Sequence, residues 1–186
     1  MRAVVVYESM FGSTRKVGEA IAEGLSDCAE VSVVSVARAD AHTLDGADLV
    51  VVGGPTHIHG MSRPSTRKAA RGASDKAGSA LELEEGADSG PGVREWLGGL
   101  GRLRVAGAAA FDTRFQGLPA FTGRASKSIG RLLARHGARI AAPPESFVVD
   151  KTGALLDGEL KRARSWGEHL TWSDCLQGVV EKRRVG

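Results

Sequence analysis

The sequence predicts a doubly wound α/β sandwich, in which helices cover both faces of a parallel β-sheet. Short apolar runs rich in valine alternate along the chain with segments whose apolar residues recur at helical spacing. This alternation is typical of βαβ units, whose right-handed crossovers build a parallel sheet. Two of the runs, residues 2–7 and 48–54, are continuously apolar, as expected of strands that are buried on both faces.

Five segments are predicted to be strands. In chain order they are residues 2–7, 30–37, 48–54, 104–111 and 139–149. The second run alternates in part, which is typical of an edge strand, and small residues weaken the strand propensity of the fourth. The pair Pro143-Pro144 must interrupt the fifth run or lie in a bulge, because proline cannot donate to a strand ladder.

Three helices are predicted between these runs, beginning after Thr14, after Gly123 and after Asp157. Their apolar residues recur at helical spacing, and Gly137 is a suitable C-terminal stop for the second helix. The helical residues that carry the pattern are Val17, Ala20, Ile21, Leu25, Ile129, Leu132, Leu133, Leu160, Ala163 and Leu170, with Trp166 expected to pack beside the last three.

We expect one domain over residues 1–172, followed by a C-terminal tail at 173–186. A chain of 186 residues is long enough for one ordinary domain with its own core. Residues 62–92 are rich in Gly, Ala, Ser and charge, and we expect a flexible or partly helical insertion or lid there, near the ligand site, with a short helical piece following at Val93–Leu97. The alternative is a tolerated surface insertion, because long surface loops cost little entropy.

The composition indicates a soluble globular protein, which we expect to be cytoplasmic. Apolar residues make up 42% of the chain and charged residues 25%, and no apolar run reaches the ~18 residues needed to cross a bilayer. The net charge is +3, but the basic residues are scattered and few aromatic residues accompany them, so neither nucleic acid nor membrane is expected as a partner. Cys28 and Cys175 lie far apart and are expected to be free thiols.

The first predicted strand runs directly into a loop of small and hydroxyl residues, Ser9 to Thr14, and a helix follows at once. A helix N-terminus offers unpaired N–H groups and a partial positive charge. Gly12 lets the backbone take a positive φ or approach a ligand closely, and Ser9, Ser13 and Thr14 add hydroxyl donors. The loop is therefore predicted to bind an anion, and phosphate is the natural one. The P-loop and the G-x-G-x-x-G dinucleotide patterns are both absent.

The stretch Ser9-Met10-Phe11-Gly12-Ser13-Thr14 resembles the S-x-T-G-N-T phosphate loop of flavodoxins. Phe11 stands where that pattern has Thr, which removes one hydroxyl donor, and Ser13 stands where it has Asn. The resemblance implies a flavodoxin-like three-layer sandwich with the strand order 2-1-3-4-5 and FMN bound at the carboxyl ends of the strands. The six residues that it assigns to the phosphate are Ser9, Met10, Phe11, Gly12, Ser13 and Thr14.

The segment after the third predicted strand, Gly53 to Met61, is similar to the second flavin loop of this family. In the implied strand order it faces the phosphate loop. The residues predicted to contact FMN there are Pro55, Thr56, His57, Ile58, His59 and Gly60. Gly60 could turn a peptide group toward flavin N5. For His57 and His59, contact with the ring or proton relay is favoured over a metal site, for which no further ligands are present, and plain loop polarity is the alternative.

The segment after the fourth predicted strand resembles the third flavin loop. The residues predicted to contact FMN there are Asp112, Thr113, Arg114 and Phe115. Arg114 could stabilise negative charge at N1 of a reduced flavin and Phe115 could stack on the ring. The alternatives are an arginine in solvent and a phenylalanine packed under its own loop. The Trp and Tyr that commonly enclose the ring in flavodoxins have no counterpart in these two segments.

The resemblance implies an FMN-binding redox protein that transfers electrons to or from a partner protein or a small acceptor. Two alternatives stay open: an NAD(P)H:quinone-type FMN oxidoreductase, and a module that kept the fold and lost the flavin. Neither a catalytic residue nor a metal site is predicted, because no acid–base pair, nucleophile or ligand cluster stands out.

Overall fold

The protein is a three-layer α/β sandwich around a parallel sheet, as the sequence predicts. The computed structural model describes residues 1–40, 42–57, 60–74, 83–84, 87, 90–118 and 122–171. Its parallel strands are β1 (Arg2–Tyr7), β2 (Glu30–Ser35), β3 (Leu49–His57), β5 (Gly107–Phe115) and β6 (Glu145–Val149). They are ordered β2-β1-β3-β5-β6, which is the predicted 2-1-3-4-5 order with β2 at an edge.

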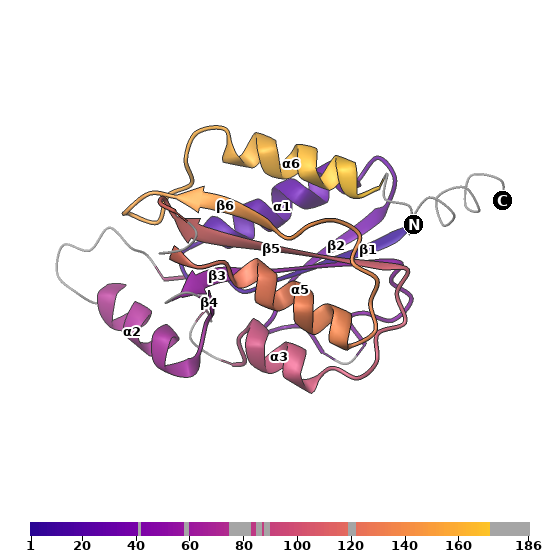
Figure 1. The fold of residues 1–186 in the computed structure, drawn as a ribbon, viewed down its shortest axis with the longest axis horizontal. Coiled ribbons are helices and arrows are strands. Elements are labelled where there is room, and N and C mark those ends of the chain that lie inside the picture. The colour runs from indigo at the N-terminus through magenta and orange to yellow at the C-terminus, as the bar shows by residue number, and fades with distance from the viewer. Residues whose placement is uncertain are drawn as a thin grey trace.

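Helices cover both faces of this sheet (Figure 1). On one face lie α1 (Ser13–Leu25) and α6 (Glu159–Leu170), and on the other lie α3 (Val93–Gly99) and α5 (Ala125–Arg135). The helices predicted after Thr14, Gly123 and Asp157 are α1, α5 and α6, and the piece predicted at Val93–Leu97 is α3. A further helix, α2 (Pro64–Ser74), lies within the 62–92 segment, which was expected to be partly helical. Residues 75–82, most of 85–89 and 172–186 lie outside the described chain.

Two strands extend further than the sequence indicates. β3 continues to His57 and β5 continues to Phe115. The two strands pair with each other as far as Pro55 opposite Thr113, and beyond that point β3 pairs with β4 (Gly60–Met61) and β5 pairs with β6. Residues assigned to two flavin loops are therefore partly strand residues. The two-residue strand β4, which folds back antiparallel to the end of β3, is too short to show in a sequence pattern.

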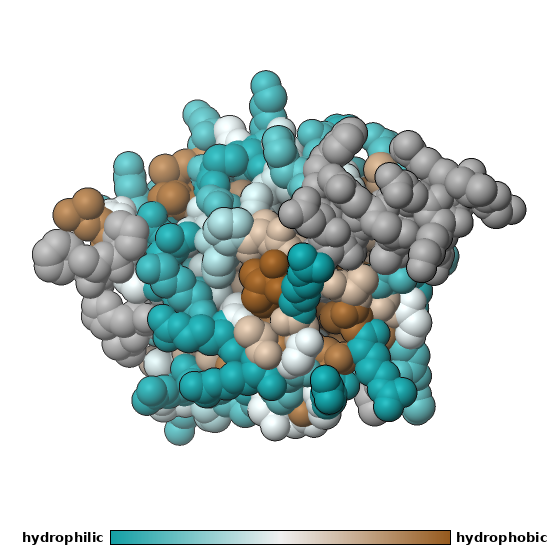
Figure 2. Space-filling model, turned by 45° about the vertical axis from the view of Figure 1, so that its right-hand side comes forward, coloured by the Kyte–Doolittle hydropathy of each residue, from teal (hydrophilic) through white to brown (hydrophobic). Residues whose placement is uncertain are grey.

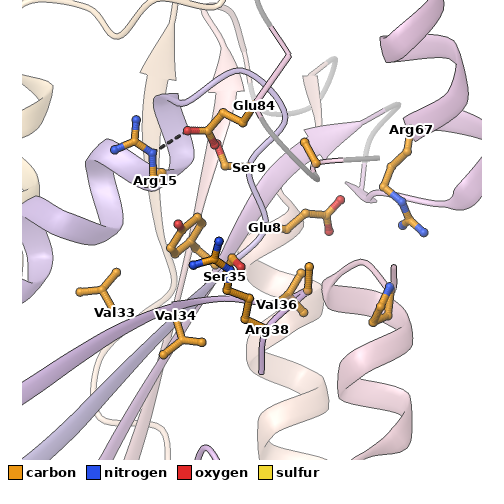
Figure 3. Close-up of a pocket in the computed structure, with 14 residues that line it drawn as sticks. Glu8, Ser9, Arg15, Val33, Val34, Ser35, Val36, Arg38, Arg67 and Glu84 are labelled. Carbon is orange, nitrogen blue, oxygen red and sulfur yellow. Dashed lines mark hydrogen bonds and ion pairs between the residues drawn. The ribbon is translucent and has the colours of Figure 1, made fainter. Parts of the chain in front are cut away.

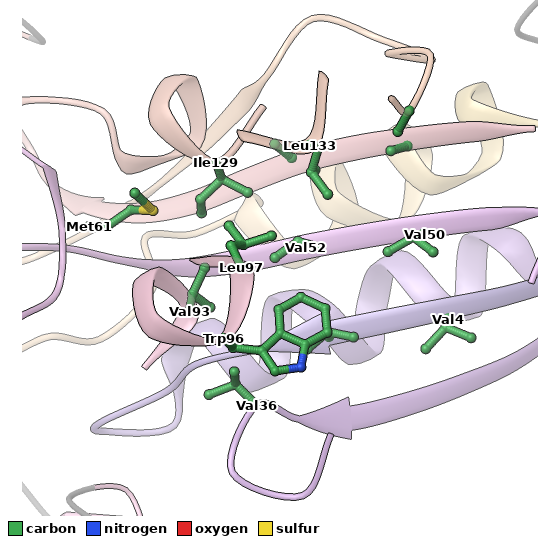
Figure 4. Close-up of a cluster of buried hydrophobic side chains, with 14 of the residues drawn as sticks. Val4, Val36, Val50, Val52, Met61, Val93, Trp96, Leu97, Ile129 and Leu133 are labelled. Atoms are coloured by element: carbon green, nitrogen blue, oxygen red, sulfur yellow. The ribbon is translucent and has the colours of Figure 1, made fainter. Parts of the chain in front are cut away.

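The core consists of two layers, one on each face of the sheet, because alternate side chains of a strand point to opposite faces. Ala3, Val5, Leu49 and Val51 pack under α1 and α6, together with Phe111. Val4, Val50 and Val52 pack on the other face with Trp96 and Leu97 of α3 and Ile129 and Leu133 of α5 (Figure 4). Both faces of the central strands are thus buried, which explains the continuous valine runs.

The helices α1 and α6 pack with their backbones in direct contact. A Cβ atom built on Gly24 would lie 2.0 Å from the carbonyl oxygen of Arg164, and one built on Gly167 would lie 2.3 Å from that of Ile21. Trp166 packs at the edge of the same layer, 6.3 Å between ring centroids from Phe147, as the helical spacing predicts. Glycine at these two positions lets the helices approach closely.

The face of the molecule shown in Figure 2 is mainly hydrophilic, and hydrophobic residues occur on it in small groups. Among the described residues the large hydrophobic side chains that are exposed are Val33, Phe115, Leu118 and Leu160. None of the helices in the described ranges is both long enough and apolar enough to cross a bilayer.

Candidate functional site

The loop between β1 and α1 has the open helix N-terminus that the sequence predicts. Gly12 takes a left-handed conformation with φ 88°, and its N–H donates to Ser9 Oγ at 3.1 Å. The first backbone hydrogen bond of α1 runs from the N–H of Lys16 to the carbonyl of Gly12 at 3.0 Å. The amides before Lys16 in the first turn therefore have no partner within the helix. No described side chain caps them. These N–H groups form the positive end of the helix dipole.

The three hydroxyl groups of this loop already have hydrogen-bond partners within the protein. Ser13 Oγ donates to the carbonyl of Gly153 at 2.6 Å, and Ser9 Oγ accepts from Gly12. Thr14 Oγ1 lies 2.7 Å from Thr113 Oγ1 in a buried pair. That pair uses only one of its two hydroxyl protons, so the other remains available. The anion-binding capacity of the loop therefore depends chiefly on backbone amides, with the hydroxyls holding the loop in place.

A carboxylate lies beside the phosphate loop. The N–H of Glu84 donates to the carbonyl of Met10 at 2.9 Å, and Glu84 Oε1 accepts from Arg15 Nε at 2.5 Å (Figure 3). The same oxygen lies 3.5 Å from the position that a Cβ atom on Gly12 would occupy. Arg15 also forms an ion pair with Glu19 at 2.8 Å. The negative charge of Glu84 thus reduces the positive potential of the helix N-terminus at the loop, and the positive charge of Arg15 partly compensates for that of Glu84.

The second predicted segment lies at the ends of β3 and β4. Thr56 Oγ1 accepts from the N–H of Ala125 at 2.9 Å and so caps the start of α5, a role that the sequence pattern did not reveal. Gly60 pairs with His57 across the β3–β4 turn, and nothing lies within 4 Å of the place where its Cβ would be. Ile58 and His59 lie outside the described residues, so their predicted contacts remain predictions.

In the third predicted segment, Asp112 differs from its neighbours. Its side chain is fully buried, and Oδ2 accepts from the N–H of Ser126 at 2.7 Å, at the start of α5. Burial raises the pKa of this carboxyl above its ordinary value. Asp112 therefore anchors α5, and among the predicted residues of this segment it is the one whose side chain does not line the site described next.

Residues from all three predicted segments line one cleft of about 100 Å³ at the carboxyl ends of β1, β3 and β5. The predicted residues that line it are Met10, Phe11, Ser13, Thr14, Pro55, Thr56, His57, Thr113, Arg114 and Phe115. Val149 and Gly153 also line it and were missed. Because β6 ends at the same edge, the Asp-Lys-Thr-Gly turn that follows this strand was the signal that could have revealed Gly153.

Two polar atoms of the cleft-lining residues are buried and unpaired. Neither His57 Nε2 nor Arg114 Nε has a hydrogen-bond partner in the described part of the chain, although Arg114 Nη1 donates to the Gly117 carbonyl at 2.8 Å. Burial lowers the pKa of His57, so the imidazole is neutral near pH 7. An unpaired buried polar group costs about 1–3 kcal/mol, so a ligand whose edge carries hydrogen-bonding groups would be stabilised here.

The exposed aromatic residue of the cleft is Phe115, 53% of whose surface is accessible to solvent. The cleft volume of about 100 Å³ is below the ~300 Å³ at which small-molecule pockets usually begin. A flat ring therefore fits only where a lining side chain, such as the exposed Phe115, turns aside. The open helix end, the left-handed Gly12 and the unpaired polar atoms together suit a ligand with a phosphate at one end and a polar-edged ring at the other.

Comparison with known proteins identifies the family. A family model described as flavodoxin matches residues 5–162. The chain belongs to the flavodoxin family. At the family level flavodoxins are FMN-binding redox proteins, and this flavodoxin has the corresponding fold.

Solved structures agree with this assignment. A flavodoxin from the domain Archaea superposes with a TM-score of 0.62 at 20% identity, covering 92% of this chain and 97% of that one. Oxidised flavodoxin 1 from Bacillus cereus superposes with a TM-score of 0.62 at 16% identity, covering 92% and 98%. The flavodiiron core of Flv1 from Synechocystis sp. PCC6803 gives 0.59 at 15%, covering 98% of this chain and 36% of that one. At these identities the likeness shows the fold alone. No curated protein matches the chain.

Proposed function

We propose that this flavodoxin binds FMN in the cleft between the three loops and transfers electrons to or from a redox partner or a small acceptor. The observation that carries the proposal is the convergence of residues from β1–α1, β3 and β5 on one cleft beside the uncapped start of α1. Bound FMN would supply the electron-carrying chemistry.

The residues of the loop would hold the phosphate end. Backbone amides in the first turn of α1 point along the helix axis, and Gly12 keeps this approach clear of a side chain. Ser9, Ser13 and Thr14 fix the loop through their hydrogen bonds. The guanidinium of Arg15, at the edge of the loop, adds a positive charge that favours a phosphate.

The residues at the other end would hold the ring. His57 Nε2 and Arg114 Nε, buried and unpaired among the described residues, would pair with polar atoms at the ring edge. Met10, Phe11 and Phe115 offer apolar surface to its faces. Neutral His57 can accept or donate a proton at one ring nitrogen, whereas Arg114 stays positively charged and favours added negative charge on the ring.

Titration of the flavin-free protein with FMN tests the proposal, with Gly12→Asp as the decisive variant. The aspartate would add a second carboxylate beside that of Glu84, at the N-terminus of α1, because its Cβ would lie 3.5 Å from Glu84 Oε1. Gly12→Ala is the control, because it also places a Cβ atom at φ 88° but adds no charge. We expect Gly12→Asp to bind FMN at least ~10-fold more weakly than Gly12→Ala, a difference of about 1.4 kcal/mol or more.

Riboflavin, which lacks the phosphate, is the second probe. If the loop binds the phosphate, wild-type protein prefers FMN over riboflavin and Gly12→Asp loses most of that preference. Wild-type protein that takes up no FMN in excess would refute the proposal. Equal FMN affinity in Gly12→Asp and Gly12→Ala would show that the loop is not the phosphate site.

A further inference from the structure

A second cavity, of about 690 Å³, lies at the carboxyl ends of β1 and β2 (Figure 3). The phosphate loop separates it from the cleft. Ser9 and Arg15 line this cavity, whereas Met10, Phe11, Ser13 and Thr14 line the cleft. Its volume falls within the ~300–1,000 Å³ typical of small-molecule sites. No residue that lines the cleft also lines this second cavity.

One wall of this second cavity is apolar. Val34 and Val36, at and just after the end of β2, line it together with Pro91 from the segment before α3. Val33 lines it too and is exposed. An apolar wall with a few polar groups around it is the usual construction of a site for a ring-bearing ligand.

The cations around the cavity differ in their partners. Arg67 is buried and forms an ion pair with Glu95 at 3.0 Å, and Arg15 is paired with Glu84. Arg38, which lines the cavity three residues after β2, is exposed and forms an ion pair with none of the described residues. Its guanidinium is therefore the cation that an incoming anion can reach without breaking an ion pair seen here. Arginine suits phosphate because its planar fork can donate two parallel hydrogen bonds.

A buried acceptor lies on the same cavity. Glu8 is only 4% exposed, and its Oε2 accepts from the N–H of Val93 at 2.8 Å. Its Oε1 has no hydrogen-bond partner within the described ranges. An unpaired buried carboxylate oxygen is costly, so a ligand that brings an N–H or O–H donor to Glu8 would be stabilised. Figure 3 shows Glu8 and Arg38 on the same cavity, with Val36 between them in the view.

From these three features we propose that the second cavity binds a purine nucleotide. The base packs on Val34 and Val36, an amino or hydroxyl group donates to Glu8, and the phosphate pairs with Arg38. A nucleotide is the ligand class that joins an apolar flat ring, hydrogen-bond donors and a phosphate within this volume. The proposal is independent of FMN binding, because the two sites share only the phosphate loop as a wall.

Calorimetric titration of the full chain with adenosine monophosphate tests this proposal. The variant is Arg38→Gln, and the matched control is Arg139→Gln, which removes an exposed arginine beside Ile140, at the opposite edge of the sheet. Saturating FMN serves as a competitor for the phosphate loop. We expect wild type and Arg139→Gln to bind adenosine monophosphate alike, with and without FMN. Arg38→Gln should bind it at least ~10-fold more weakly, and adenosine should bind wild type more weakly than the monophosphate does.

Each other result overturns the proposal. Absence of binding at millimolar nucleotide means that the cavity does not take this class. Equal affinity of Arg38→Gln and wild type for adenosine monophosphate means that the phosphate does not pair with Arg38. Competition by FMN places the nucleotide in the phosphate loop. Nucleotide binding that depends on Arg38 in a protein that takes up no FMN would refute the proposed flavin function while supporting this one.

Discussion

The side chains of Thr14 and Thr113 are hydrogen-bonded to each other, Oγ1 to Oγ1, at 2.7 Å in a buried pair. Thr14 lies in the first turn of α1 and Thr113 in β5, 99 residues further along the chain. This bond fixes the phosphate loop to the strand that carries Arg114 and Phe115. It therefore sets the relative position of the two ends of the proposed flavin site.

Replacement of either threonine by valine is expected to destabilise the protein by about 1–3 kcal/mol, because the remaining hydroxyl is left buried without this partner. The double variant Thr14→Val/Thr113→Val should cost less than the sum of the two single changes, because it leaves no unpaired hydroxyl. Urea unfolding of the four proteins measures the coupling. Strictly additive effects would mean that the bond contributes nothing to stability.

Glu84 is expected to weaken phosphate binding, because its carboxylate lies beside Gly12 at the start of α1. Glu84→Gln should raise the affinity for FMN several-fold at low salt, with a smaller gain at high salt, where charges are screened. Glu19→Gln is the matched control. Glu19 pairs with the same Arg15, but it lies one turn further along α1 from the loop. Weaker FMN binding in Glu84→Gln would show instead that Glu84 positions Arg15 for the phosphate.

The fold followed from the sequence because its signals are local. Valine runs buried on both faces, helical spacing and the glycine that ends α5 each lie within a few residues, and the sheet has the predicted strand order. The ends of β3 and β5 lie beyond the predicted bounds. Their extension depends on pairing with residues that are distant in sequence, such as Pro55 with Thr113 and Phe115 with Val149.

The sequence could not predict which side chains of the candidate site face the cleft, because this depends on side-chain direction and on contacts between distant residues. Asp112 and Thr113 are neighbours, yet one caps α5 and the other faces the cleft, because successive strand residues point to opposite faces. The role of Thr56 at the start of α5 depends on a contact with Ala125, 69 residues away. Glu84, beside the phosphate loop, lies in a segment whose composition indicated only an insertion.

The contact between α1 and α6 predicts a severe effect of a small change. Gly24→Ala would place a methyl group 2.0 Å from the backbone carbonyl of Arg164, so the helices must separate, at a cost of about 1–3 kcal/mol or more. Gly98→Ala in α3 is the control, because nothing lies within 4 Å of its Cβ position. That change should be neutral or stabilise by about 0.5–1 kcal/mol, as alanine does in helices. Similar thermal midpoints for the two variants would contradict the close packing.

The buried imidazole of His57 predicts that the protein loses stability in acid. Burial lowers its folded-state pKa below the ordinary 6.5, so the unfolded chain takes up a proton at a pH at which the folded protein does not. The free energy of unfolding therefore falls as the pH drops from about 6.5 toward the lowered value, by at most about 1.4 kcal/mol per pH unit for one proton. His57→Gln should remove this slope, as measured by urea unfolding of the flavin-free protein between pH 5 and 7.5.

His42 supplies a control of opposite sign for this pH dependence. Its pKa is raised by the hydrogen bond to Asp45 at 3.0 Å, so its contribution is present below the ordinary pKa of 6.5 and is lost as the pH rises through the raised value. His42→Gln should therefore make the loss of stability in acid slightly steeper, whereas His57→Gln makes it shallower. If the two variants change the slope in the same direction, His57 is not a buried neutral imidazole, and its role at the edge of a bound flavin must be abandoned.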